Sequence, residues 1–125
     1  MSNPRFFFAK INGPKGGPYA EGIFHVQIFI PKQYPMEKPD VQFKTKIYHP
    51  NVDSEGRVGL DIVQNKWMPN LQLRDVLAGI QMLLTCPNME DPMDEVVADH
   101  FLNDEHAACK QAREWTEEYA EPVPA

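Results

Sequence analysis

Two hydrophobic patterns follow one another along the chain, strands first and helices afterwards, and this order most limits the folds available to it. Residues 22 to 30 alternate in polarity, and the apolar members of one face are Phe24, Val26, Ile28 and Ile30. This period of two predicts a half-buried antiparallel strand. Arg5 to Ile11 and Asp40 to Lys46 predict two more strands. Turns rich in glycine and proline separate the three, which indicates a meander and not βαβ units.

The second half of the chain has the period of helices. Six branched apolar residues between Leu73 and Leu84 form a stripe wide enough for a buried helix. Pro87 ends this helix, because a residue before proline disfavours the α region. A short helix is predicted over Asp94 to Leu102 and a longer one over Asp104 to Tyr119, whose predicted stripe is Ala108, Ala112, Trp115 and Tyr119.

The ends of the last helix complete the predicted organisation. Asn103 or Asp104 is expected to cap its start. Glu121 to Ala125 is expected to be a frayed tail. Residues 1 to 125 are therefore predicted to form a single α+β domain, an antiparallel sheet followed by helices.

Residues 47 to 70 hold no period, although this is a long segment for a compact domain. Irregular loops of such length are usually either functional or disordered. Apolar residues are spread through the segment and favour an ordered loop; they are Val52, Val58, Leu60, Ile62 and Trp67.

Charge and composition exclude several classes of protein. The net charge of -6 argues against a nucleic-acid binder, which needs a basic surface. The acidic side chains gather in residues 90 to 125, either as solvated helix faces or as an acidic docking patch. No apolar run is long enough for a membrane span, and Met1 to Pro4 do not begin a secretory signal.

Cysteine and histidine usage points to neither a disulfide framework nor a metal site. Cys86 and Cys109 are too few for such a framework, which predicts a cytoplasmic or nuclear protein. His100, His106 and Cys109 lack the ligand spacing typical of zinc. We therefore expect neither a metal nor a cofactor.

A set of short motifs supports a resemblance to a known family. The motifs are Gly13-Pro14, Pro18-Tyr19, Gly22-Ile23-Phe24, Tyr34-Pro35, Tyr48-His49-Pro50-Asn51, Trp67 with Pro69, Pro87-Asn88 with Asp91-Pro92, and Trp115. In this order and spacing, from about Arg5 to Tyr119, the chain resembles the ubiquitin-conjugating (UBC) enzymes. Residues 34 to 36, 46 to 53 and 56 to 57 look most like the conjugating enzyme that builds non-degradative ubiquitin chains with an inactive UBC variant.

The resemblance implies a fold and two departures from it. The implied fold has an N-terminal helix, a four-stranded antiparallel meander, an active-site loop and three further helices. Gly59 stands eight residues after Asn51, where the family carries ubiquitin on a cysteine, and glycine offers no nucleophile. The chain also opens almost directly on the first strand, so the first helix is expected to be missing. The apolar surface this uncovers is expected to favour a homo-oligomer.

The resemblance also implies roles for residues near Gly59. Asn51 matches the asparagine that either stabilises an oxyanion or holds the loop; from the residues alone it could equally be a turn-former. Asp91 matches the carboxylate that orients the incoming lysine, and the alternative is an ordinary exposed carboxylate. Asp61 is expected to serve hydrogen bonding of the loop. His49 is expected to be structural, and Trp67 a core anchor.

The implied partners are ubiquitin, a ubiquitin ligase and an inactive UBC variant. Ligase binding is carried over to Met36, Pro69 and Asn70, although Met68-Pro69-Asn70 replaces the family's usual Ser-Pro-Ala. The variant's face is expected to include Phe29, while Gln27 and Gln42 stand where charged residues are frequent.

Three functional hypotheses follow from the sequence. The chain is derived from a thioester-forming ubiquitin transferase and lacks its nucleophile, or it is a pseudo-enzyme that binds ubiquitin, a ligase or a UBC variant, or it is a structural module that keeps the fold. Cys86 is the alternative thiol to check, although no cationic residue flanks it to favour the thiolate.

Overall fold

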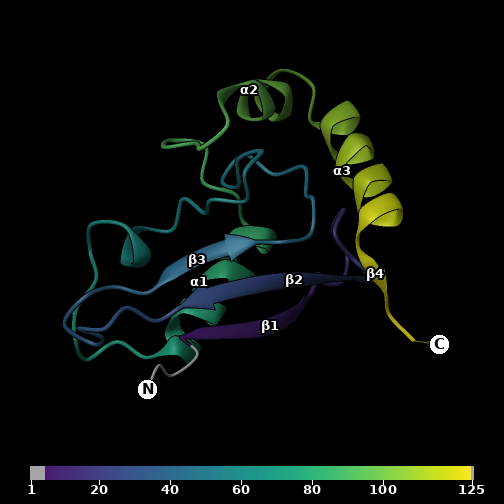
Figure 1. Cartoon of the computed structure of the whole chain (residues 1–125). Coiled ribbons are helices and arrows are strands. Elements are labelled where there is room, and N and C mark those ends of the chain that lie inside the picture. The colour runs from purple at the N-terminus through teal and green to yellow at the C-terminus, as the bar shows by residue number, and fades with distance from the viewer. Residues whose placement is uncertain (1–4, 125) are drawn as a thin grey trace.

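The computed structural model describes residues 5 to 124, in which three strands precede three helices (Figure 1). The elements in chain order are β1 (Phe6–Asn12), β2 (Gly22–Phe29), β3 (Asp40–Phe43), a 3-10 turn (Asp61–Val63), α1 (Leu73–Thr85), α2 (Glu95–Asn103), α3 (Glu105–Tyr119) and β4 (Glu121–Pro122). The predicted α+β fold is confirmed. Expectations for residues 1 to 4 and for Ala125 fall outside the described residues.

The sheet is an antiparallel meander in the order β1, β2, β3, as the alternating pattern predicts. Ala9 pairs with Val26, and Ile28 pairs with Val41. The prediction that the third strand continues to Lys46 is wrong, because β3 ends at Phe43. Beyond it the backbone N–H groups of Lys44 and Thr45 both donate to the His25 carbonyl, which bends the chain out of the ladder.

The fourth strand of the sheet comes from the C-terminal end of the chain. The prediction of a frayed tail from Glu121 is wrong, because Glu121 pairs with Ile23 in β2 and Pro122 pairs with Gly22. The Glu121 carboxylate also lies 2.7 Å from His25 Nε2. These contacts attach the tail to the sheet.

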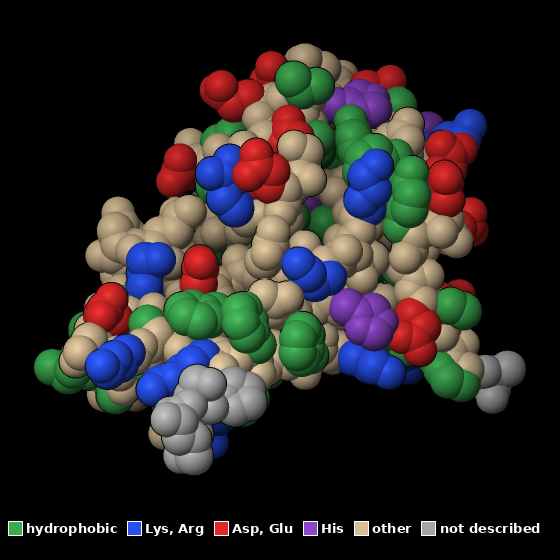
Figure 2. Space-filling model, in the orientation of Figure 1, with side chains coloured by type: hydrophobic (Ala, Val, Ile, Leu, Met, Phe, Trp, Pro, Cys, Tyr) green, Lys and Arg blue, Asp and Glu red, His purple; other side chains and the backbone are tan. Residues whose placement is uncertain are grey.

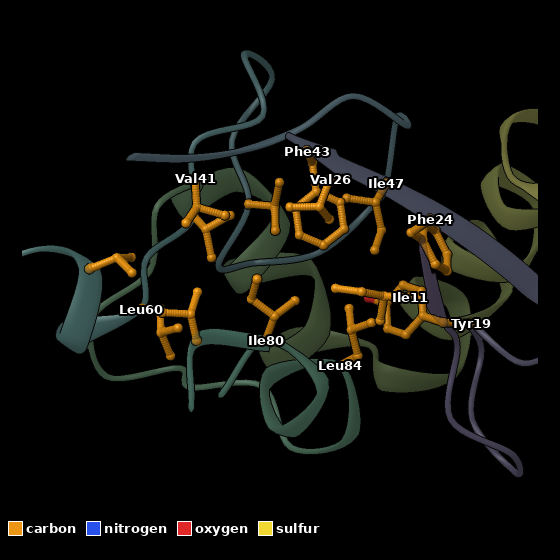
Figure 3. Packing of buried hydrophobic residues seen from close by; sticks show 14 of the residues in the cluster. Ile11, Tyr19, Phe24, Val26, Val41, Phe43, Ile47, Leu60, Ile80 and Leu84 are labelled. Atoms are coloured by element: carbon orange, nitrogen blue, oxygen red, sulfur yellow. The ribbon is translucent and has the colours of Figure 1, made fainter. Parts of the chain in front are cut away.

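The core lies between one face of the sheet and α1, which passes behind it in Figure 1. The predicted inward residues of β2 are buried, and Phe24 and Val26 are fully excluded from solvent. Figure 3 shows Ile80 and Leu84 of α1 facing the side chains of the sheet. Three residues of the predicted α1 stripe are buried, Val76, Ile80 and Leu84, so the stripe is narrower than predicted.

The last two helices begin at aspartate caps. Asp94 accepts a hydrogen bond from the Val97 N–H, and Asp104 accepts one from the Ala107 N–H. Of the two caps predicted for α3, the structure uses Asp104.

The buried stripe of α3 differs from the predicted one at its C-terminal end. It continues through Ala108 and Ala112 to Thr116 instead of Trp115 and Tyr119. The two rings instead pack edge to face on one another and lie under the Lys46 ammonium, which is 5.5 Å from the Trp115 ring and 5.0 Å from the Tyr119 ring.

Figure 2 shows many acidic side chains over the two C-terminal helices, with hydrophobic side chains among them, and a row of hydrophobic side chains along the sheet. The exposed aromatic residues of the sheet are Phe6, Phe7 and Phe8 of β1 and Phe29 of β2. Within residues 5 to 124, no helix has the length and apolar character needed to cross a membrane.

Candidate active site around Gly59

A buried histidine fixes the start of the loop that leads to Gly59. The His49 Nδ1 accepts from the Asn51 backbone N–H at 2.9 Å, so Nε2 carries the proton and donates to the Leu83 carbonyl of α1 at 2.7 Å. Burial lowers the pKa of His49 to about 4, although its bond to Leu83 opposes this shift. A neutral, fully buried ring that is bonded to two backbone groups holds the loop and is not available to a ligand as an acid or a base.

The Asn51 side chain joins this loop to the segment after α1. Its Nδ2 donates to the Asn88 carbonyl, its Oδ1 accepts from the Asn88 N–H, and both distances are 2.8 Å. The residue is fully buried. Of the roles that the sequence leaves open for Asn51, this geometry supports holding the loop, because both polar atoms of the amide are already engaged by backbone.

Two consecutive backbone carbonyls of the loop accept the hydrogen bonds that fix Gly59 and the segment opposite it. The Gly59 N–H donates to the Asn51 carbonyl at 2.7 Å, while the N–H groups of Met93 and Asp94 donate to the Pro50 carbonyl at 2.8 and 3.1 Å. Residue 59 therefore lies between the 49–51 loop and the start of α2.

A hollow of about 390 Å³ opens beside Gly59. Its lining residues are Gly59, Leu60, Asp61, Gln64, Asn65, Lys66, Leu83, Asn88 and Asp91. The structure thus brings together three of the predicted site residues, Gly59, Asp61 and Asp91. Asn51 is buried and is not part of the lining.

The two carboxylates of the hollow are both exposed to solvent. Asp61 is the first residue of the 3-10 turn, and its backbone carbonyl accepts from the N–H groups of residues 64, 65 and 66. Loop hydrogen bonding at Asp61 thus involves its carbonyl. The carboxylates of Asp61 and Asp91 lie where a cationic group entering the hollow would meet them.

Trp67 is partly buried and packs against the core, in keeping with the expected anchor, and it also joins two loops. Its Nε1 donates to the Pro35 carbonyl at 2.7 Å, and its ring packs against Tyr34 with centroids 5.9 Å apart. This exposed hydrogen bond connects the loop of Pro35 to the loop of Trp67. Met36 and Pro69 are exposed on the two loops that Trp67 ties together.

The face expected to bind a UBC variant carries aromatic, amide and charged side chains. Phe29 packs on Phe6 with ring centroids 5.1 Å apart. Gln27 and Gln42 are cross-strand partners, and Gln42 Nε2 donates to the Glu55 carbonyl.

Neither cysteine lines the hollow. Cys86 is exposed at the C-terminal cap of α1, and Cys109 is partly buried on α3. Burial raises the pKa of Cys109, which keeps that thiol protonated. In the part of the chain that the structure describes, no three His, Cys, Asp or Glu side chains are grouped to hold a metal ion.

Four residues near the hollow escape sequence reasoning: Gln64, Asn65, Lys66 and Met93. The first three lie in its wall, in a segment without a period. Met93 packs against Gly59 and accepts a hydrogen bond on Sδ from Gln64 Nε2 at 3.6 Å. A glycine gives no signal of what fills the space beside it, so only the fold reveals this neighbour.

Comparison with known proteins gives consistent matches over nearly the whole chain. A family described as ubiquitin-conjugating enzyme matches residues 2–116. Ubiquitin-conjugating enzyme E2 13 of Saccharomyces cerevisiae is 48% identical over 98% of this chain and 80% of its own length. Ubiquitin-conjugating enzyme E2 N of Macaca fascicularis is 49% identical over 95% of this chain and 78% of its own.

A solved structure agrees with these matches. The E2 domain of a Toxoplasma gondii ubiquitin conjugating enzyme superposes with a TM-score of 0.89 and 38% identity. The alignment covers 94% of this chain and 81% of that one.

Proposed function

The chain belongs to the ubiquitin-conjugating enzyme family, and we propose that it takes part in ubiquitin transfer without accepting ubiquitin as a thioester. Membership of this family implies a role in the ubiquitin pathway. It also implies that ubiquitin and ubiquitin ligases are partners of the chain. The two free cysteines favour the cytoplasm or the nucleus as its compartment.

The observation that carries the proposal is Gly59 in the hollow beside the loop of Asn51. An acyl carrier needs a nucleophilic atom at the attack position, and glycine has no side chain to provide one. The polar side chains that line the hollow end in carboxylate, amide and ammonium groups. None of these forms a thioester.

The residues around Gly59 support descent from a working transferase. Asn51 still joins the loop to Asn88, and Asp91 still borders the hollow, where it would orient the amine of an acceptor lysine. These residues remain although the nucleophile is absent. Their presence favours a pseudo-enzyme that binds partners over a module that only keeps the fold.

Ligase binding is proposed for the two loops that Trp67 ties together. Met36 is 72% exposed, and Pro69 and Asn70 are exposed beside Met68. Methionine side chains adapt to different apolar partners, which suits a surface that contacts a ligase.

A competition experiment tests this proposal. Ubiquitin ligation is reconstituted with an active E2 N enzyme and a ligase that works with it, and the chain is added in increasing excess. We expect the ligation rate to fall, and Met36→Ala to weaken the effect. Met82→Ala is the matched control, because Met82 is similarly exposed but lies on α1. A rate unchanged by a large excess of the chain would favour the purely structural module.

The aromatic face of β1 and β2 is the proposed contact for a UBC variant or a second copy of the chain. Phe8 is 74% exposed and Phe6 packs on Phe29, so the patch presents apolar area to solvent. Sedimentation of the chain alone and with a UBC variant, compared with a Phe8→Asp variant, tests this contact. A monomer that binds no variant would contradict it.

A further inference from the structure

We propose that the Met93 side chain covers residue 59 and fills the space in which a nucleophile's side chain would lie. The carrier position is then closed as well as empty. The inference rests on the proposed function only in taking residue 59 as the carrier position. Its geometry stands on contacts within this chain.

The first support is the lack of room at Gly59. A β-carbon added there would lie 2.6 Å from Met93 Cγ and 3.3 Å from Met93 Sδ. Non-bonded carbon atoms are comfortable at about 3.5–4.0 Å, so the methionine has to move before any larger residue can fit. The same carbon would lie 3.6 Å from the Asn51 carbonyl oxygen, which is an ordinary contact. Met93 is thus the group that closes the position.

The second support is that the two backbones cannot move apart easily. Gly59 is held by the Asn51 carbonyl, and Met93 and Asp94 are held by the Pro50 carbonyl next to it. Asp94 is also the cap of α2, so a shift of this segment would disturb the helix start. Only rotation of the Met93 side chain remains as a way to relieve the contact.

The third support is the hydrogen bond that holds Met93 in this position. Gln64 Nε2, across the wall of the hollow, donates to Met93 Sδ at 3.6 Å. Thioethers are weak acceptors, so this bond biases the rotamer without locking it. Methionine remains mobile enough to open the position at a modest cost.

The sizes of the side chains at residues 59 and 93 are therefore coupled. A larger side chain at residue 59 requires a smaller or rotated one at residue 93. Restoring the thiol with Gly59→Cys alone would put a cysteine under a methionine. Met93→Ala would uncover it. Met93 is on this account a positioning residue, which sets access to residue 59 and takes no part in bond formation.

Thiol labelling measures that access without any ubiquitin chemistry. Gly59→Cys is made in a Cys86→Ser/Cys109→Ala background, with and without Met93→Ala, and each variant is treated with iodoacetamide. The thiolate attacks the methylene carbon and iodide leaves. To expose the thiol at residue 59 to the reagent, the Met93 side chain has to rotate away from its preferred rotamer. Because Met93→Ala removes this cost, we expect it to raise the labelling rate by a factor of about three to ten. Met82→Ala in the same background is the control and should not change the rate.

Equal labelling rates with and without Met93→Ala would overturn the inference. Thermal unfolding provides a second readout, since Gly59→Ala should lower the melting temperature more in the presence of Met93 than in a Met93→Ala background. Additive shifts would also overturn it. If uncovering speeds labelling but the restored thiol is not charged by activating enzyme and ubiquitin, the Met93 inference holds and the assignment of residue 59 as the carrier position fails.

Discussion

Two regions of this molecule are held together in different ways. Between the sheet and α1, apolar side chains such as Val26 and Ile80 are buried without directional contacts. Around Gly59, His49 and Asn51 are buried polar residues, and each polar atom of their side chains has a backbone partner. Among the residues described, no buried side-chain nitrogen or oxygen lacks a hydrogen bond.

The difference separates the frame of the site from its chemistry. None of the bonds that hold the loop uses the side chain of residue 59; only its N–H takes part. A glycine there leaves the loop's hydrogen bonds in place, whereas a change at His49 or Asn51 would remove them. The loop can therefore keep the family's shape after the nucleophile is lost.

The largest expected effect is in the apolar region. Ile80→Ala removes a side chain that is 1% exposed and leaves a cavity against the sheet. We expect the free energy of unfolding to fall by about 3 kcal/mol, as measured by urea denaturation. Leu102→Ala, on an exposed position of α2, is the control and should change it little. Equal losses in the two variants would contradict the assigned core.

The second expected effect is a dependence of stability on pH, which tests whether the His49 ring is buried. The pKa of His49 is lowered to about 4, so the folded state stays neutral where an unfolded histidine, with a pKa near 6.5, takes up a proton. The unfolded state then binds more protons as the pH falls, and stability decreases from about pH 6.5 down to about pH 4, at most by about 1.4 kcal/mol per pH unit.

Nuclear magnetic resonance titration of the His49 ring measures this directly. A midpoint well below the value near 6.5 of a histidine in an unfolded chain is expected. A midpoint near 6.5 would mean that the ring is solvated and that the loop is built differently.

The third effect is at the amide that joins the two loops. Asn51→Ala leaves the N–H and carbonyl of Asn88 without their partners, which should cost about 2 kcal/mol of stability. Hydrogen exchange should also quicken at the Asn88 N–H before it does in α1. Asn65→Ala, exposed in the wall of the same hollow, is the matched control. Unchanged exchange at Asn88 would show that the side chain does not hold this segment.

The smallest effect concerns the C-terminal strand. Glu121→Gln removes the charge beside His25 and Lys10 on a largely solvated surface. Exposed pairs contribute little, so the loss should stay below about 1 kcal/mol, and high salt should reduce it. The backbone pairing of β4 should survive, and loss of the β4 signals in the variant would mean that the ion pair alone holds the strand.

The comparison also explains what the sequence could predict. Aromatic residues in Arg5 to Ile11 indicate β1. Periodicity locates β2, the start of β3, α1 and α3, because burial of one face leaves a regular mark on the residues. It cannot locate β4, since Glu121 and Pro122 pair through backbone atoms that carry no sequence signal. Asn51 is found by its motif, but its bond to Asn88 depends on two segments far apart in the chain. The sequence around Met93 does not indicate that it packs on residue 59, because glycine has no side chain that could mark the contact.

The most direct test of the account is a charging reaction with adenosine triphosphate, ubiquitin-activating enzyme, ubiquitin and the unmodified chain, read on a non-reducing gel. An active E2 N enzyme in parallel verifies the reagents. The account predicts no reductant-sensitive ubiquitin adduct on this chain, because Gly59 provides no thiol. A reductant-sensitive adduct on the unmodified chain would contradict it, and loss of that adduct in Cys86→Ser would identify the exposed thiol after α1 as the carrier.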